Sequence, residues 1–509
     1  MTTTQLAAPR TAAGSLNGVV ALVCLNALLC FAVFSLTRRY LDYSDMVENY
    51  AWGISWALGN NKHPPLFGWI AAAWFGIFPK TDGAYYLLAA VNLLVSFLFL
   101  ALSMRRFLSP PQLFVAVALT LMFSRFGVDA GYKYNANVAQ YPFIAAFLWA
   151  VLNGVETRRD RWWVLSGVFV AAAVLCKYSA AALVVAMAVA AWMVLRPDLR
   201  IVLRGAGIAA AVSIVLVAPH VWWEIRHGWP SLGYMEASHG AAAGPSTAAA
   251  LLDALSGAAQ YSALPLAVWM AINLWPGDGW RWSPRERPRQ RLGLAVYAVS
   301  FLMTCLSSWA GGVDTVAAWF IVPSLFVGWA IVDGLPNTRP WPLLRRRMVW
   351  AYAFYAVAFA AIYAGLALYP GRGTPSQGVA LQRQLALDAD AAFKARYGGS
   401  AGFAAGDFPL PYAFSFYAPG RTQSLFSNDV AQSPWIDPSA FRQGSKVVLC
   451  GTVDGPGTQV RDDCVASATR LLGEPASGQE FTYTVPGTED VAANRRVFSV
   501  LFYPAARTD

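Results

Sequence analysis

The chain has 509 residues, of which 57% are hydrophobic and only 13% charged, and its formal net charge is +10. Its apolar residues form long uninterrupted blocks, unlike those of an average soluble domain, so the composition indicates a polytopic membrane protein. The positive charge does not indicate a nucleic-acid-binding protein, because the arginines lie in short clusters between apolar blocks rather than along one basic face.

The apolar blocks predict eleven membrane-spanning helices, each of which needs about 20 residues to cross a bilayer. In chain order they cover residues 16–37, 84–104, 111–128, 136–153, 162–176, 179–195, 204–221, 258–275, 293–310, 315–334 and 348–368. The first block is too long for a removed signal peptide and lacks a small-residue cleavage site, so we expect it to remain as the first span.

The basic residues predict the orientation of these spans. Short cytoplasmic loops hold an excess of Lys and Arg, and a cytoplasmic N-terminus puts five arginine clusters between spans on that side. The clusters are Arg105 and Arg106; Arg158, Arg159 and Arg161; Arg196, Arg200 and Arg204; Arg281, Arg285, Arg287, Arg289 and Arg291; and Arg345, Arg346 and Arg347. This orientation requires that residues 162–195 form two short helices with Lys177 at the outer turn. Lys177 is a lone charge in an apolar stretch, and such a residue is either functional or extends to the interface.

Three long segments then lie on the outer side: residues 38–83, residues 222–257 and everything after Pro370. From there the apolar blocks give way to Gly, Pro, Asp and Ser, with short strand-like runs such as KVVLC and RRVFSVLFY. We therefore expect a transmembrane domain over residues 1–369 and a soluble extracytoplasmic α/β domain over residues 370–509.

The outer domain contains two cysteines, Cys450 and Cys464. In an oxidising compartment they would pair as a disulfide, and the alternative is two unpaired thiols. The sequence has no P-loop and no dinucleotide-binding fingerprint. No cytoplasmic loop is long enough for a nucleotide-binding domain, so we do not expect a mechanism driven by ATP or by a nucleotide sugar.

The first outer segment contains SDMVENYAWGISWALGNNKHPPLFGW, residues 44–69, in which acidic and basic residues occur close together. Apolar residues recur at helical spacing, which predicts an amphipathic helix over residues 45–58 at the membrane surface, with Ser44 as its N-cap. Asp45 and Glu48 would share one face of the first turn. There they either take part in catalysis or only interact with the helix dipole.

A basic pair follows the acidic pair. Lys62 and His63 precede Pro64 and Pro65, which stop a helix and hold the basic residues in extended chain. A carboxylate cluster beside a cationic cluster suits a reaction in which a hydroxyl loses a proton while a phosphate departs. The carboxylate accepts the proton, and the cations stabilise the growing negative charge.

Other polar residues also fall on the outer side. The second outer turn, RFGVDAGYKYNANVAQYP, supplies Arg125, Asp129, Lys133, Tyr134, Asn135 and Asn137. The beginning of the outer segment 222–257 supplies His220, Trp222, Trp223, Glu224, Arg226, His227 and Trp229. Tryptophans at this depth are either interfacial anchors or platforms for sugars. The histidines (His63, His220, His227 and His239) match no compact metal motif, so a divalent metal is possible but is not indicated, and we expect no other cofactor.

The order of these motifs resembles a known enzyme superfamily. An acidic pair in the first outer loop is followed by KHPPL, KYNAN, VLCKYSA and APHVWWEIRHGWPS. This order is similar to that of the GT-C membrane glycosyltransferases related to protein O-mannosyltransferases and to the transferase that puts aminoarabinose on lipid A. The resemblance covers roughly residues 15–368, and the combination of D..E with HPPL is its most specific part.

The resemblance implies a polyprenyl-phosphate-linked sugar donor, an acceptor hydroxyl and a single inverting displacement at the outer face of the membrane. Asp45 matches the first-loop aspartate proposed as the catalytic base, and Glu48 matches its acidic partner. The family often has adjacent acids, whereas two residues separate them here, so either acid could be the base. Asp42 and Asp129 are reserve candidates.

On this hypothesis, two sets of side chains contact the substrates. The donor phosphate would contact Lys62, His63, Lys177 and Lys133. Tyr134, Asn137, Trp223, Glu224 and His227 would bind the substrates. A lipid-linked donor agrees with the outer position of these residues, because nucleotide sugars are absent outside the cytoplasm.

The predicted function is therefore transfer of a hexosyl or pentosyl group to a hydroxyl of lipid A, another envelope glycan, a lipid or a protein. We expect a bacterial inner-membrane protein with a cytoplasmic N-terminus, a periplasmic C-terminal domain and no nucleic-acid partner. The alternative is a transporter or lipid flippase, which would need polar groups near the bilayer midplane. A structural or assembly protein would leave the acid and base cluster unexplained.

Overall fold

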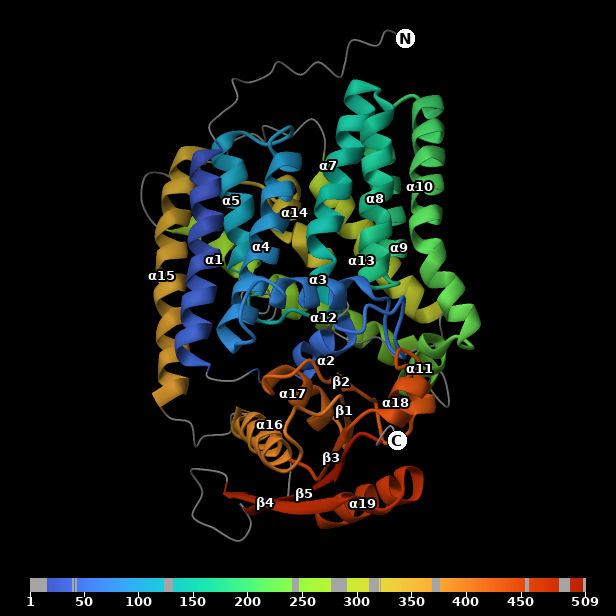
Figure 1. Ribbon diagram of the computed structural model, residues 1–509. Helices are drawn as coiled ribbons and strands as arrows, with labels where there is room; N and C mark the ends of the chain where they lie inside the picture. Colours follow the sequence, from blue (N-terminus) through green and yellow to red (C-terminus); the bar gives the residue numbers. More distant parts are fainter. Residues whose placement is uncertain are drawn as a thin grey trace. The chain divides into compact units, whose positions relative to one another are not determined.

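The computed structural model describes residues 16–38, 41, 44–122, 131–239, 247–275, 291–310, 320, 322–368, 376–453, 457–484 and 495–506 (Figure 1). The chain forms two compact units, each assembled from segments far apart in the sequence. The first unit comprises Met1–Ala32, Ala89–Val221 and Met235–Ala360, and the second comprises Val33–Leu88, Trp222–Tyr234 and Ala361–Asp509. We describe each unit by itself.

Apolar helices dominate the described chain, as the composition predicts. They are α1 (Asn17–Thr37), α4 (Asp82–Met104), α5 (Pro110–Leu121), α6 (Ala136–Ala139), α7 (Tyr141–Thr157), α8 (Asp160–Cys176), α9 (Ala180–Leu195), α10 (Leu199–Arg226), α12 (Thr247–Leu274), α13 (Leu292–Ala310), η3 (Pro323–Phe326), α14 (Val327–Gly334) and α15 (Trp341–Leu368). In the described residues, six helical segments are long and apolar enough to cross a membrane. Every predicted span overlaps one of these helices, while the number of eleven spans remains a prediction.

The predicted break at Lys177 is confirmed. Helix α8 ends at Cys176, Lys177 has extended backbone angles (φ −160°, ψ 132°), and α9 begins at Ala180. Helix α10 differs more from expectation, because it continues to Arg226, beyond the predicted end of its span at residue 221. A hydropathy block marks only the part of a helix that lies in hydrocarbon, so polar residues can extend the helix beyond it.

The segment predicted as a long outer loop, residues 222–257, is therefore largely helical in its described part. It contains the end of α10, all of α11 (Pro230–His239) and the beginning of α12 at Thr247. Residues 240–246 lie outside the described part of the chain.

Close packing fixes the helices of the first unit. A Cβ added at Gly328 of α14 would lie 2.0 Å from the Ala116 carbonyl oxygen of α5, so these helices approach more closely than a larger residue would allow. Helices α1 and α15 lie side by side, and the Tyr352 hydroxyl donates to Asn26 Oδ1 at 2.8 Å (Figure 1).

Two long helices leave apolar side chains uncovered by protein. Ile214 and Val215 of α10 and Phe354 and Val357 of α15 are each about 70% exposed. A continuous apolar helix surface of this kind is what a lipid-facing helix presents. The two helices therefore support a multi-pass membrane protein.

The second unit contains the short helices of the first outer segment and a mixed α/β domain. Its remaining elements are α2 (Ser44–Gly53), α3 (Leu66–Phe75), α16 (Ser376–Tyr397), β1 (Phe403–Gly406), α17 (Leu410–Tyr417), β2 (Gln423–Ser424), η4 (Val430–Gln432), α18 (Pro438–Gln443), β3 (Lys446–Cys450), α19 (Thr458–Leu472), β4 (Ser477–Thr484) and β5 (Arg495–Tyr503). The strand order is β2-β1-β3-β5-β4. Strand β1 is parallel to β2 and β3, whereas β5 is antiparallel to β3 and β4.

The C-terminal domain agrees with the sequence in its main features. The runs KVVLC and RRVFSVLFY form β3 and β5, and Val447, Val500 and Phe502 are fully buried in the core of the domain. Cys450, at the end of β3, is bonded to Cys464 of α19, so the helix is tied to the sheet.

The surface helix predicted over residues 45–58 is wrong in its length and its surroundings. Helix α2 ends at Gly53, and all its residues from Met46 onward are buried. It packs against α3 on one side and against α17 of the C-terminal domain on another, so protein covers the face that we expected water to cover. A Cβ added at Gly53 would lie 1.9 Å from the Gly68 carbonyl oxygen, which shows how closely α2 and α3 approach.

Candidate active site

The two acids of the first outer segment meet one basic side chain. Asp45 and Glu48 lie in the first turn of α2, and Lys62 follows in the loop before α3. The Lys62 Nζ atom is 3.1 Å from Glu48 Oε2 and 3.7 Å from Asp45 Oδ1. The shared face expected for the two carboxylates is confirmed, because a single ammonium group reaches both.

The two carboxylates differ in their exposure. The side chain of Glu48 is only 3% exposed, whereas that of Asp45 is 26% exposed and that of Lys62 is 18% exposed. Asp45 is thus the acid that a substrate can approach. Glu48 lies behind it, where it can fix the position of Lys62.

Burial and charge act against each other in this cluster. Burial raises the pKa of Glu48 to about 7, although the charge of Lys62 lowers it and that of Asp45 raises it further. Burial alone would lower the pKa of Lys62, but the charges of Glu48 and Asp45 outweigh that effect and raise it above its usual value. The ammonium therefore stays charged, and the Glu48 carboxyl titrates near neutral pH.

The loop that carries Lys62 is held by an asparagine that the sequence reasoning missed. Asn60 Oδ1 accepts hydrogen bonds from the backbone N–H of Lys62 at 2.9 Å and of His63 at 2.8 Å. Asn60 is itself buried. Asparagine favours such turns because its side chain can accept from the backbone two residues on, so its place before KHPP was an available signal.

Aromatic side chains surround the acid helix. The Trp52 ring lies edge-on to His63, Phe67, Tyr412 and Trp435, with centroid distances of 6.4, 6.1, 6.0 and 6.3 Å. Tyr412 and Trp435 belong to the C-terminal domain. No local pattern could have identified them, since they lie more than 350 residues after α2 in the sequence.

Tyr412 is also coupled electrostatically to the cluster. It is fully buried, and burial together with the charge of Glu48 holds its pKa well above the usual value. The Lys62 ammonium lies over the Trp52 ring at 6.0 Å and over the Tyr234 ring at 5.5 Å. Such cation–π contacts stabilise the charged form of Lys62 in a partly buried position.

Trp223 and His227 pack beside the same loop. A Cβ added at Gly59 would lie 2.3 Å from the Trp223 ring, so this ring covers the residue before Asn60. The His227 ring stacks on Trp223 at 4.3 Å, and Nδ1 is 2.8 Å from the Trp223 carbonyl oxygen. Glu224, the next residue of α10, is only 1% exposed.

The first unit holds a second cluster of polar side chains. Lys177 donates a hydrogen bond to Asn137 Oδ1, which joins the break between α8 and α9 to α6. Beside it in sequence, the Tyr178 hydroxyl is 2.7 Å from His220 Nε2. Lys133 lies over the Tyr132 ring at 5.3 Å.

The predicted site residues therefore form two groups, one in each unit. Asp45, Glu48, Lys62, His63 and Trp223 come together in the second unit, with Glu224 and His227 on the same segment as Trp223. Lys177 and Asn137 come together in the first unit, which also contains Lys133 and the fully buried Tyr134. The reserve candidates Asp42 and Asp129, and also Arg125, lie outside the described residues.

A possible metal site can be judged from its ligands. Within the described chain, the cluster with suitably close ligand atoms consists of Asp407, Cys450 and Cys464. The two sulfur atoms are bonded to each other, and Asp407 Oδ2 accepts from the Gly451 N–H at 2.7 Å. These groups are occupied by protein contacts and do not form a metal site.

Part of the chain matches a known protein family. Residues 62–223 match the family model of the dolichyl-phosphate-mannose-protein mannosyltransferases. This segment begins at Lys62 and ends at Trp223. No curated protein sequence matches the chain.

The fold has a counterpart among solved structures. The chain is similar to ArnT from Cupriavidus metallidurans in the apo state, with a TM-score of 0.59 and 16% sequence identity, over 95% of this chain and 98% of that one. At this identity the likeness concerns the fold. The chain is thus a polytopic membrane protein with the GT-C fold, and the matched segment together with that fold supports a glycosyltransferase of the GT-C type.

Proposed function

We propose that the chain transfers a sugar from a polyprenyl-phosphate donor to an acceptor hydroxyl at the outer face of the cytoplasmic membrane, with Asp45 as the catalytic base. The observation that carries the proposal is the shared contact of Asp45 and Glu48 with Lys62 on a buried helix. A transferase of this type needs a carboxylate held in place beside a cation, and this cluster supplies both.

The proposed reaction is a single displacement with inversion at the anomeric carbon. The acceptor oxygen forms a bond to that carbon while the bond from the carbon to the phosphate oxygen breaks, and its electron pair leaves with the polyprenyl phosphate. The acceptor proton moves to the Asp45 carboxylate. Asp45 is favoured over Glu48 as the base because its side chain is 26% rather than 3% exposed.

Glu48 and Lys62 have supporting roles in this scheme. Glu48 holds the Lys62 ammonium at 3.1 Å, and this ammonium lies 3.7 Å from the Asp45 carboxylate, which it helps to position. Lys62 and His63 then face the leaving phosphate, where positive charge stabilises the departing group. The roles of Lys177, Lys133, Tyr134, Asn137, Glu224 and His227 in substrate binding remain predictions.

The donor class rests on the family and on location. The matched family is described as dolichyl-phosphate-mannose-protein mannosyltransferases, and the solved structure with a similar fold is ArnT. A lipid-linked donor also agrees with lipid-facing helices such as α10 and α15. The GT-C fold favours this function over a transporter or flippase.

The proposal is tested by the Asp45→Asn variant in membranes supplied with polyprenyl-phosphate sugars. Transfer should be lost, with donor binding and expression retained, because Asn cannot accept the acceptor proton. Asp462→Asn, which changes an acid whose side chain is 59% exposed on α19, is the matched control and should transfer at the wild-type rate. Full activity of Asp45→Asn would move the base to Glu48 or to another residue.

A further inference from the structure

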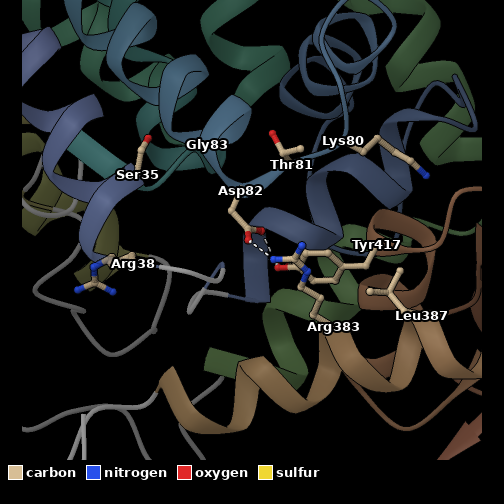
Figure 2. A pocket seen from close by; sticks show the side chains of 9 residues that line it. All are labelled: Ser35, Arg38, Lys80, Thr81, Asp82, Gly83, Arg383, Leu387 and Tyr417. Carbon is tan, nitrogen blue, oxygen red and sulfur yellow. Dashed lines mark hydrogen bonds and ion pairs between the residues drawn. The ribbon is translucent and has the colours of Figure 1, made fainter. Parts of the chain in front are cut away.

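A polar cavity lies in the second unit, and its lining residues are not those used in the proposed reaction. Its volume is about 220 Å³, and it is lined by residues from the end of α1, the start of α4, α16 and α17. Figure 2 shows Asp82, Arg383 and Tyr417 meeting at its centre, with Arg38 on another wall. The polar side chains give this cavity the character of a site for a charged group.

The cavity carries an excess of positive charge. Its lining has three basic side chains, Arg38, Lys80 and Arg383, and one acidic side chain, Asp82. Lys80 is held in place, since its Nζ donates to the Ala418 and Gly420 carbonyl oxygens at 2.6 and 2.8 Å. The two arginines are the groups that a ligand would meet.

The acidic residue is already compensated by protein. Asp82 Oδ1 accepts from the Tyr417 hydroxyl at 2.9 Å, and Asp82 Oδ2 lies 3.4 Å from Arg383 Nη1. The Arg383 side chain is 46% exposed, so its guanidinium can also bind a group from outside. A guanidinium has five N–H donors and binds phosphate through two of them at once.

Arg38 and a hydroxyl complete the cavity wall. The Arg38 guanidinium is kept at its position by the rings of Phe34 and Tyr363, with distances of 5.7 and 5.3 Å to their centroids. Ser35 Oγ, which also lines the cavity, is buried and has no hydrogen-bond partner among the described residues. A buried hydroxyl without a partner costs free energy, which a bound ligand would recover.

The position of the cavity indicates where its ligand comes from. Helix α1 ends at Thr37, directly before Arg38, and α4 begins at Asp82; both helices are candidate membrane spans. The ends of spans lie at the level of lipid headgroups, where arginines meet phosphates. We propose that the cavity lined by Arg38, Asp82 and Arg383 binds the phosphate group of a membrane lipid.

This inference goes beyond the proposed transfer reaction, and its test needs no turnover. The full chain in detergent is titrated with dioleoylphosphatidic acid, with dioleoylphosphatidylcholine or with inorganic phosphate. The number of bound lipid or phosphate molecules is measured by native mass spectrometry. The wild type should bind phosphatidic acid most tightly. Arg38→Gln and Arg383→Gln should each weaken that binding ~10-fold, the loss expected for a charge-assisted hydrogen bond.

Two further variants keep the test decisive. Arg396→Gln removes the same charge from α16 outside the cavity, where Arg396 donates to Gln479, and should bind as the wild type does. Gly83→Leu fills the cavity without a change of charge and should therefore weaken binding. This variant tests the cavity independently of Arg383, whose loss also removes the ion pair with Asp82. Thermal unfolding of each variant checks that it is folded.

Three results bear on the proposal. Weaker binding in Arg38→Gln, Arg383→Gln and Gly83→Leu, with unchanged binding in Arg396→Gln, would support it. Equal binding by all the variants would overturn it, because the lipid would then be held elsewhere. Inorganic phosphate that binds as tightly as phosphatidic acid would overturn the assignment to a lipid.

Discussion

Asp45 and Glu48 contact the same ammonium, yet their surroundings give them different properties. Glu48 is buried, and its pKa is raised to about 7, while Asp45 remains accessible. Because the pKa of Glu48 is raised, the folded protein binds this proton more tightly than the unfolded chain does at pH values between the unfolded pKa of Glu48 and about 7. A reaction that requires ionised Glu48 should therefore gain rate as the pH rises through neutrality.

Lys62 sets the position of this pH dependence. The charge of Lys62 lowers the pKa of Glu48, so Lys62→Met should raise that pKa further above 7. We expect the acid limb of the pH–rate profile for transfer to move upward by about one unit or more, because an opposite charge at this distance has effects of that size. Rates measured from pH 5 to 9 in wild type and variant test this.

A matched substitution separates charge from shape. Lys62→Arg keeps the positive charge and should leave the acid limb near its wild-type position, even if the rate falls. An acid limb that stays in place in Lys62→Met would contradict the assignment of the titrating group to this cluster.

At the scale of elements, the approach of α2 to α3 fixes the acid helix. A Cβ at Gly53 would lie 1.9 Å from the Gly68 carbonyl oxygen, which is backbone and cannot rotate away. Gly53→Ala should therefore force α2 from α3 and lower the free energy of unfolding by about 1–3 kcal/mol, as overpacking does. Thermal unfolding in detergent measures the change.

Gly233 provides the control for that substitution. It lies in α11, and no heavy atom is within 4 Å of a Cβ added there. Gly233→Ala should leave stability unchanged or raise it slightly, because alanine favours a helix over glycine. Equal melting temperatures for Gly53→Ala and Gly233→Ala would show that the contact between α2 and α3 does not limit stability.

The sequence predicts elements well where the signal is local. Apolar blocks located the helices, short strand-like runs located β3 and β5, and Lys177 located the break between α8 and α9. The extent of α10 and the burial of α2 could not be predicted in the same way. Helix ends beyond the hydrocarbon carry no hydropathy signal, and α2 is covered by α17, which is about 360 residues distant in the sequence.

The candidate site shows the same limit. Asp45, Glu48 and Lys62 could be grouped from sequence because they lie within 18 residues of one another. Tyr412 and Trp435 could not, because only the folded chain brings them to Trp52. Asn60 could have been identified from the sequence, since its side chain organises a local turn.

At the scale of the whole molecule, the C-terminal domain belongs to the same compact unit as the first outer segment. Its α17 packs on α2, and the Trp435 ring lies 6.3 Å from the Trp52 ring. The domain therefore supports the acid cluster and is more than an appended module. Removing its contacts should impair transfer even though none of its residues is assigned a chemical step.

Trp435→Ala tests this role of the domain. Trp435 is 7% exposed, and loss of its indole leaves a cavity beside Trp52 at a cost of about 3–5 kcal/mol. We expect a strong fall in transfer rate together with a lower melting temperature. Leu471→Ala, which changes a residue 51% exposed on α19, is the control and should affect neither. Wild-type transfer by Trp435→Ala would mean that the domain does not position α2.

The most direct test of the account is transfer from radiolabelled polyprenyl-phosphate sugars by membranes that contain the wild type or Asp45→Asn. Lipid, glycan and protein fractions are separated and counted. The account predicts label in one of these fractions with the wild type and none with Asp45→Asn, and that fraction identifies the acceptor. Absence of transfer from every lipid-linked donor, by folded and abundant wild-type protein, would contradict it.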